Sequence, residues 1–167
     1  MDVDGEYSAY VAARWPVLVR SAVLLGCSVH EAEDLVQSTL VKCYLSWDKV
    51  AKASNQDGYV YRIMLNTHRS NHRRSWREQP SDRLPEGAPT DGSEAFGLAD
   101  TVRAALSGLS LDSRAVVVLR FFADFTDQQT ADVLGIPVGT VKSRLSRALA
   151  RLSEDPQLAE IIGRSQP

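Results

Sequence analysis

The side chains with the clearest chemical potential are basic ones that gather in two separate segments. The first segment carries five arginines: Arg62, Arg69, Arg73, Arg74 and Arg77. The second carries Lys142, Arg144, Arg147 and Arg151. The net charge of the 167-residue chain is nevertheless −2, because acidic residues are concentrated elsewhere, notably around residues 31–34. Since guanidinium and ammonium groups bind phosphate oxygens, two basic patches indicate two separate contacts with nucleic acid.

A metal-dependent enzyme is the alternative that the titratable residues allow. His68 and His72 have the i, i+4 spacing that places two imidazoles on one face of a helix, where they could begin a zinc site. However, the residues after His68 are Arg69 and Ser70, so the glutamate of a metalloprotease motif is missing. No third ligand is spaced convincingly, His30 is equally isolated, and arginines would repel a cation. We therefore expect no catalysis, no metal and no cofactor.

Residues 126–152 predict the elements that position the second basic segment. Thr126 and Gln129 have the spacing of a capping box at the start of a helix. The small residue Ala131 lets two helices approach closely, and Gly135 can take the left-handed conformation that ends the first of them. Pro137 fits at or beside the first position of the next helix. This is the spacing of a DNA-reading helix-turn-helix.

The second helix of this motif divides into two faces. Apolar residues recur at i, i+4, i+7, i+8 and i+11 and predict a buried stripe: Val141, Leu145, Ala148, Leu149 and Leu152. The residues facing away are polar or basic: Thr140, Lys142, Ser143, Ser146, Arg147 and Arg151. No acidic residue occurs from Val138 to Leu152. A basic, acid-free helix after a glycine turn suits the major groove of DNA.

The middle of the chain separates two domains. Residues 77–92 are rich in Pro, Gly, Ser and Asp and have scarcely any apolar residues, which predicts an exposed, flexible linker. No strand-like alternation of any length is present. We therefore expect an all-α fold of two small helical domains, residues 1–76 and 94–153, joined by the linker 77–93. Residues 154–167 are expected to form a short helix or a tail.

The composition indicates a protein of the cytoplasm. No apolar run approaches the ~20 residues of a membrane span, and the acidic N-terminus is unlike a signal peptide. We therefore expect no membrane insertion. Cys27 and Cys43 lie in apolar patterns that look helical, which favours buried free thiols over a disulfide or a ligand role.

Helical periodicity predicts three long helices in the N-terminal domain. The first covers residues 7–25, with Pro16 kinking it or starting a second helix. The next opens with a capping box of Ser28 and Glu31. Its buried stripe is Ala32, Leu35, Val36, Thr39, Leu40, Cys43 and Tyr44. Glu33, Asp34, Gln37, Val41 and Lys42 lie off that stripe. Residues 47–56 are expected to form a loop.

The third long helix, residues 57–76, positions the first basic segment. Val60, Ile63, Met64 and Thr67 are expected to face inward. Arg62, Asn66, Arg69 and Arg73 line up at i, i+4, i+7 and i+11. Such a stripe is an electrostatic match to phosphates, although a basic stripe is also common on an ordinary solvated face.

The C-terminal domain is expected to hold two further helices before the helix-turn-helix. The first covers residues 94–107 and is closed by Gly108 as a C′ glycine. Ser110 then caps a helix over residues 111–122. Its core side chains are predicted to be Val117, Val118, Phe121 and Phe122.

Three motifs follow one another along the chain: HEAEDLVQSTLVKCY (residues 30–44), DGYVYRIMLNTHRSNHRR (57–74), and LSLDSRAVVVLRF (109–121) followed by LGIPVGTVKSRLSRALARL (134–152). In this order they resemble a bacterial sigma-70-type initiation factor of the extracytoplasmic-function (ECF) group, the short kind with only the second and fourth conserved regions. The resemblance covers nearly the whole chain apart from the linker and the ends. It implies a factor that binds core RNA polymerase and directs promoter recognition and opening.

The resemblance also implies roles for particular residues. The helix bearing the DLVQ motif would dock on the clamp helices of the largest polymerase subunit, through Asp34, Gln37 and Val41. The helix 57–74 would grip and open the −10 element, where a non-template base leaves the stack. Its candidate contacts are Arg62, Asn66, Arg69 and Arg73, with Ser54 and Asn55 as weaker candidates in the preceding loop.

The helix-turn-helix resembles the −35 reader of such factors. Its groove-facing candidates are Lys142, Ser143, Ser146 and Arg147, and Thr140 would contact a phosphate. Many such factors carry a bulky or basic residue where this chain has Ser146.

The implied partners are core RNA polymerase, through its clamp helices and flap region, and promoter DNA. An anti-sigma protein is a further partner that the resemblance allows. The linker would thread toward the active-site cleft and the RNA exit path. The alternative is a stand-alone helix-turn-helix transcriptional regulator, which would leave the DLVQ helix and the first basic helix unexplained.

Overall fold

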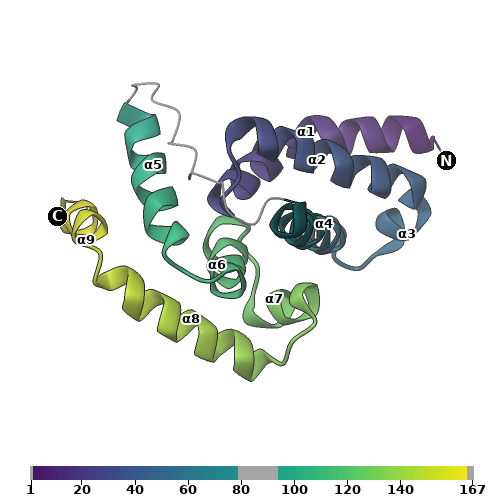
Figure 1. Cartoon of the computed structure of the whole chain (residues 1–167). Coiled ribbons are helices and arrows are strands. Elements are labelled where there is room, and N and C mark those ends of the chain that lie inside the picture. The colour runs from purple at the N-terminus through teal and green to yellow at the C-terminus, as the bar shows by residue number, and fades with distance from the viewer. Residues whose placement is uncertain (1, 79–93, 165–167) are drawn as a thin grey trace. The chain divides into compact units, whose positions relative to one another are not determined.

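The computed structural model of the chain describes residues 2–78 and 94–164. Over these residues it consists of helices and contains no β-strand, which confirms the predicted all-α class (Figure 1). The described residues form two compact units: the first contains residues 2–22 and 28–78, and the second contains residues 23–27 and 94–164. Most of the predicted linker, residues 79–93, lies outside the described residues. None of the described helices combines the length and the apolar composition that a membrane span needs.

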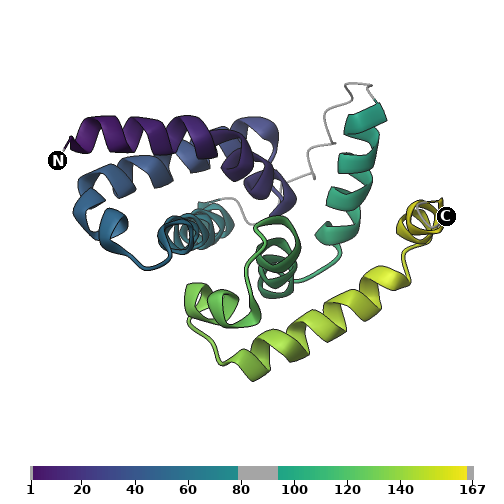
Figure 2. The same ribbon diagram turned by 180° about the vertical axis from the view of Figure 1, so that it is seen from behind.

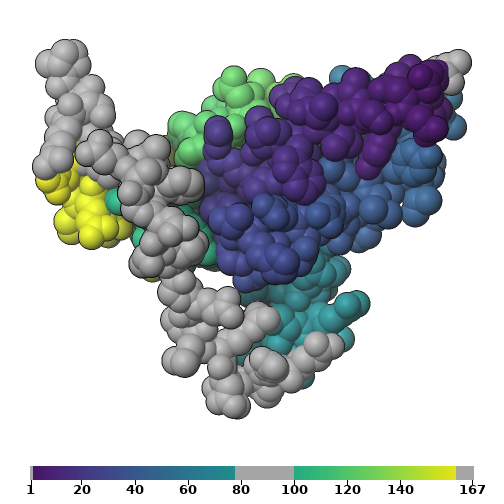
Figure 3. Space-filling model, turned by 90° about the horizontal axis from the view of Figure 1, so that it is seen from above, coloured from purple at the N-terminus to yellow at the C-terminus, as the bar shows by residue number. Residues whose placement is uncertain are grey.

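The first unit contains most of α1 (Val3–Leu24), together with α2 (Val29–Leu45), α3 (Trp47–Lys52) and α4 (Gln56–Glu78). Helices α1 and α2 lie side by side (Figures 2 and 3), and α2 packs against α4. The predicted stripe of α2 is buried from Ala32 to Cys43, and Val60, Met64 and Thr67 of α4 are buried as predicted. Ile63 is half-buried, and Tyr61 and Leu65 join the core.

Ser28 begins α2 as predicted. Its hydroxyl accepts a hydrogen bond from the backbone N–H of Glu31 (3.2 Å) and donates one to the Glu31 carboxylate (3.0 Å). The Glu31 side chain is thus engaged by the hydroxyl, and the predicted capping box is formed on one side only.

Three predictions for the first unit are wrong. Helix α1 begins at Val3 rather than at residue 7; it continues through Pro16, so of the two alternatives predicted for that residue a second helix does not start there. Residues 47–52 form α3 because Trp47 and Val50 are buried in the core, a long-range effect that six residues of local pattern do not reveal. Tyr44 is exposed rather than buried. Its ring packs edge-to-face on Tyr7 (5.0 Å between centroids) and its hydroxyl donates to Asp4 (2.8 Å), so it lies at the rim of the core.

The second unit contains α5 (Glu94–Ser107), α6 (Leu111–Val117), the π-helical turn η1 (Val118–Phe122), α7 (Asp127–Leu134), α8 (Val138–Ser153) and α9 (Pro156–Arg164). Ser110 caps α6 as predicted, with its hydroxyl accepting from the Ser113 N–H (3.2 Å). The last helix, α9, forms the predicted short C-terminal helix and contacts α5 and α8.

The π-helical turn corrects the predicted core of the segment 111–122. Phe121 is 55% exposed and Phe122 is exposed as well, whereas Leu119 and Phe125 are buried. In η1 the backbone N–H of Ala123 bonds to the carbonyl of Val118 (3.0 Å), an i to i+5 bond that widens the turn. The wider turn changes the angle between successive side chains, so the α-helical spacing assigned the two phenylalanines to the wrong face.

Two further details of the second unit differ from the prediction. Leu149 is 41% exposed, and of the predicted stripe of α8 only Val141 and Ala148 are fully buried. Gly108 follows α5 but does not take the left-handed conformation. The guanidinium of Arg114 instead donates to the carbonyls of Leu106 (3.0 Å) and Leu109 (2.9 Å), so the end of α5 is satisfied without a C′ glycine.

Both cysteines are buried and free, as predicted. Cys27 lies in the turn after α1 rather than in a helix. Burial raises the pKa of the Cys43 thiol to about 11, so this thiol is protonated and unreactive at neutral pH.

Candidate nucleic-acid and partner interfaces

Helix α4 has a buried half and a projecting half. Its N-terminal half is held by core side chains as far as Thr67, whereas no side chain from Ser70 to Arg77 is buried. The end of α4, in teal, extends beyond the helices that cover its beginning (Figure 3). The projecting half is therefore available to a partner over several turns.

The predicted basic stripe lies along this helix. Arg62, Asn66 and Arg73 are exposed and Arg69 is half-buried. No acidic residue occurs from Gly58 to Arg77, so nothing within this part of the helix neutralises the arginines. A groove of about 510 Å³ is lined by Ser70, Arg73, Arg74 and Arg77. Guanidinium groups at such spacing can pair with successive phosphate oxygens.

An exposed aromatic side chain was missed by the sequence prediction. Trp76 is 69% exposed and follows Arg73 by three residues and Arg69 by seven. It therefore extends the basic stripe toward the end of α4. An indole ring beside arginines is a surface on which a nucleic-acid base can stack. The sequence did contain a signal for this exposed ring, because Trp76 is the one aromatic residue in a segment without apolar periodicity.

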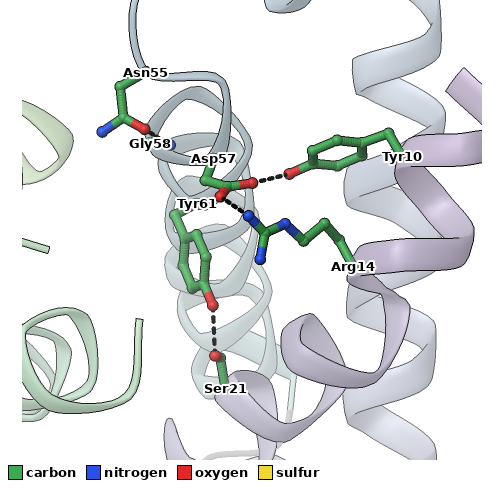
Figure 4. A network of polar contacts seen from close by, with 7 residues as sticks. All are labelled: Tyr10, Arg14, Ser21, Asn55, Asp57, Gly58 and Tyr61. Carbon is green, nitrogen blue, oxygen red and sulfur yellow. Dashed lines mark hydrogen bonds and ion pairs between the residues drawn. The ribbon is translucent and has the colours of Figure 1, made fainter. Parts of the chain in front are cut away.

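The loop Ala53–Asn55, between α3 and α4, carries the two weaker candidates for the −10 contact. Ser54 is exposed. Asn55 is half-buried, and its carboxamide oxygen accepts a hydrogen bond from the backbone N–H of Gly58 (2.9 Å; Figure 4). Asn55 thus caps α4, and a Cβ at Gly58 would lie 2.6 Å from its side-chain nitrogen. The carboxamide oxygen of Asn55 is therefore already used in a hydrogen bond to the backbone of α4.

The helix-turn-helix is confirmed in detail. Thr126 and Gln129 form a complete capping box at the start of α7. Gly135 takes the left-handed conformation (φ 66°, ψ 36°) that ends α7, and Pro137 is the N-cap of α8. Ala131 and Val141 pack with Val116 in the core of the motif. The turn at Gly135 and Pro137 therefore sets the direction of α8 relative to α7, and the small side chain of Ala131 allows the two helices to pack closely.

The outer face of α8 carries the predicted −35 candidates. Lys142, Ser143, Ser146 and Arg147 are exposed, and Thr140 is half-buried. The Ser143 hydroxyl donates to the carbonyl of Thr140 (3.1 Å), within the helix. The first acidic residue after Pro137 is Glu154, beyond the end of the helix. This face is cationic along its whole length.

A third surface lies on α2. Asp34, Gln37 and Val41 are exposed at i, i+3 and i+7 and so share one face. Asp34 lies 3.4 Å from the imidazole of His30, but both side chains are largely exposed and such a pair adds little stability. Leu45, which is 79% exposed, continues this face and was missed by the prediction. Acidic at one end and apolar at the other, the face suits a protein partner rather than DNA.

The two histidines of the enzyme hypothesis lie one turn apart on α4. His68 and His72 have ring centroids 6.4 Å apart. Within residues 2–78 and 94–164 no group of three His, Cys, Asp or Glu side chains is placed to hold a metal ion.

Comparisons with protein families match both halves of the chain. The model for sigma-70 region 2 matches residues 11–78, and the model for sigma-70 region 4 matches residues 99–152. The first match contains the α2 face and the basic stripe of α4, and the second contains the helix-turn-helix.

Individual relatives extend over nearly the whole chain. The RNA polymerase sigma-E factor of Streptomyces avermitilis is 37% identical over 96% of this chain and 90% of its own length. The ECF RNA polymerase sigma factor EcfG of Rhodopseudomonas palustris is 33% identical over 86% of this chain and 81% of its own length. Among solved structures, the sigma factor RpoE in complex with the anti-sigma factor NepR from Bartonella quintana has a TM-score of 0.75 at 30% identity, covering 93% of this chain and 98% of that one.

Proposed function

The chain belongs to the ECF group of the sigma-70 family of RNA polymerase sigma factors, and we propose that it divides promoter recognition between its two units. It binds core RNA polymerase and directs promoter recognition and opening for transcription initiation. Its action consists of binding and of separating DNA strands, without a bond-making step. It works with polymerase in the cytoplasm, at the nucleoid.

The observation that carries the division is the pair of basic helices on two separate units: α4, which has no acidic residue from Gly58 to Arg77, and α8, which has none at all. A stand-alone regulator would need only the second. We place the region 2 domain at residues 1–76, the linker at 77–93, the region 4 domain at 94–153 and the tail at 154–167.

The first unit docks on polymerase and holds the −10 element. Asp34, Gln37 and Val41 on α2 bind the clamp helices of the largest subunit, a role supported by their exposure on one face. Arg62, Asn66, Arg69 and Arg73 on α4 contact the −10 DNA, with Ser54 and Asn55 at its loop. The acid-free surface supports this assignment because an opened strand exposes its phosphates and bases together.

The second unit reads the −35 element. Lys142, Ser143, Ser146 and Arg147 enter the major groove and Thr140 contacts a phosphate. The unit also contacts the flap region of polymerase. Each DNA contact alone is modest, and docking on polymerase fixes the separation of the two units, so that the contacts act together.

An anti-sigma protein is a further proposed partner. The structure of RpoE, which is 30% identical to this chain, is that of a complex with the anti-sigma factor NepR. We propose that this chain is also held by such a protein when it is inactive.

Reconstituted transcription tests the function. The chain is combined with core RNA polymerase of its source organism on a library of genomic fragments, and the 5′ ends of transcripts are sequenced. We expect start sites that share two conserved elements at one fixed separation. Start sites unaffected by the chain, or a dimer footprint on a palindrome without polymerase, would favour the stand-alone regulator.

The docking face is tested in the same system. Asp34→Ala with Gln37→Ala is expected to weaken pull-down of core polymerase while the fold is retained, because exposed positions change stability by only about 0.5 kcal/mol. Unchanged pull-down by this double variant would refute the assignment of α2.

A further inference from the structure

The loop Ala53–Asn55 is held by residues of a helix far away in the sequence. The carboxylate of Asp57, in the first turn of α4, accepts a hydrogen bond from the Tyr10 hydroxyl (2.8 Å) and pairs with the Arg14 guanidinium (2.5 Å; Figure 4). Tyr10 and Arg14 lie one turn apart on α1. Both oxygens of this carboxylate are thus engaged by α1, which fixes the start of α4 in direction as well as in distance.

Tyr10 also touches the helix on the other side of the loop. Its ring packs on that of Trp47 in α3, with 5.7 Å between the centroids. Tyr7 packs on the same indole (5.4 Å). The two helices that flank the loop, α3 and α4, are therefore both held by α1, and Tyr10 contacts both of them.

A second polar link lies one turn further along α4. The hydroxyls of Tyr61 and Ser21 are 2.7 Å apart, and both side chains are buried (Figure 4). This link holds the body of α4, whereas the Asp57 cluster holds its first turn and the Asn55 cap next to it. The two links therefore have separable roles.

We propose that Tyr10, Arg14 and Asp57 form a positioning cluster that sets the geometry of the Ala53–Asn55 loop for base selection in the −10 element. The inference rests on the proposed function, because the loop is assigned there to the −10 contact. None of the three residues reads a base: they act through the loop. Base contacts require placement within a fraction of an ångström, whereas phosphate attraction tolerates small shifts. Loosening the cluster therefore lowers selectivity more than affinity.

The test uses the full chain with core polymerase on one promoter identified by the library experiment, with each −10 base pair changed in turn. Tyr10→Phe removes only the hydroxyl and keeps the ring on Trp47. Asp57→Asn removes the ion pair. Tyr44→Phe is the matched control, because it removes another tyrosine–aspartate hydrogen bond of the same length in the same unit, away from the loop.

We expect Tyr10→Phe and Asp57→Asn each to lower the preference for the best −10 base about tenfold, the lower end of the discrimination that one well-placed base contact provides. The effect of the double variant is expected to be little larger than that of the stronger single variant, because both changes act on the contacts of the same Asp57 carboxylate. Core binding, the salt dependence of DNA binding and the midpoint of thermal unfolding should match those of Tyr44→Phe.

Unaltered base preference in both single variants would overturn the positioning role. So would an equal reduction on all templates accompanied by a lowered unfolding midpoint, since that is the signature of a purely structural contact. Failure of the proposed function is a different result: the wild-type chain would then direct no promoter-specific transcription, and the inference would fall with it.

Discussion

Helices α4 and α8 present the two basic faces of the molecule, yet they are held in place by different means. Helix α8 follows a short turn whose shape is set by its own residues, with Gly135 in the left-handed conformation and Pro137 as N-cap. Helix α4 follows a loop whose flanks are held by Tyr10 and Arg14, 47 and 43 residues before Asp57. The direction of α8 is thus encoded locally, whereas that of α4 depends on long-range contacts.

The two helices also differ in how they are anchored. Helix α4 buries large side chains in its N-terminal half, among them Tyr61 and Met64, and buries none from Ser70 to Arg77. Helix α8 buries only Val141 and Ala148 over its whole length. The arginines from Arg73 to Arg77 therefore lie far from the core, whereas every basic residue of α8 lies within a turn of Val141 or Ala148.

The largest effect is expected in α8, because only two of its side chains, Val141 and Ala148, are fully buried. Val141→Asp places a carboxylate at a position with no solvent exposure and without a partner, which costs about 3 kcal/mol or more. We expect the second unit to unfold while the first unit remains folded, as measured by circular dichroism and by amide NMR spectra of the full chain. Ser143→Asp is the control, because it adds the same charge at an exposed position of the same helix. It should leave the fold intact and weaken DNA binding, and equal unfolding of both variants would contradict the assignment of the core.

The next effect concerns the basic stripe of α4. Arg69→Ala with Arg73→Ala is expected to lower the slope of log affinity against log salt by close to two units, about one for each phosphate that the variant no longer binds. Promoter opening should fall more than core binding. Arg20→Ala, at an exposed position of α1, is the control for a general loss of positive charge. If the double variant opened linear promoter DNA as efficiently as wild type at all salt concentrations, the stripe would be an ordinary solvated face.

This comparison also explains what the sequence could predict. The capping box of Thr126, the turn at Gly135 and the pairing of Ala131 with Val141 follow from local chemistry, and all three are present in the structure. The exposure of Asp34, Gln37 and Val41 followed from periodicity alone.

Three features were not predicted because they depend on long-range contacts or on backbone geometry that the local sequence pattern does not reveal. Helix α3 exists because Trp47 meets Tyr7 and Tyr10 of α1. Phe121 faces outward because a π-helical turn shifts the phase of the helix. The Asp57 cluster joins residues that no spacing rule connects. The roles of the site residues in binding stay predictions.

A smaller effect is expected at one residue of α8. Arg147→Ala should relax discrimination at the −35 element by about 1–3 kcal/mol, because an exposed guanidinium can pair bidentately with a guanine edge. Lys142→Ala is the matched comparison: if Lys142 holds a phosphate, its removal weakens binding to all sequences about equally. The measurement is transcription or binding over a library of −35 variants. A uniform reduction with Arg147→Ala would make that residue the phosphate contact and leave base reading to Lys142 and Ser143.

The smallest expected effect concerns a difference in side-chain type between the outer face of α8 and the basic stripe of α4. The outer face of α8 has no aromatic side chain, whereas the stripe of α4 ends in the exposed Trp76. Of these two faces only that of α4 offers a ring on which an unpaired base can stack, which agrees with the role in opened DNA proposed for it.

Trp76→Ala is therefore expected to weaken binding of a labelled single-stranded −10 oligonucleotide to the polymerase complex by about 1 kcal/mol, the lower end of the range for one stacked base. Trp76→Phe should keep most of the affinity because it keeps an aromatic face. Binding of a duplex carrying only the −35 element should be the same for both variants, because that contact depends on α8. Equal affinity of the alanine variant and the wild type for the single strand would show that the indole is not a stacking surface. The contact of α4 with DNA would then depend on polar and charged side chains alone, as is proposed for α8.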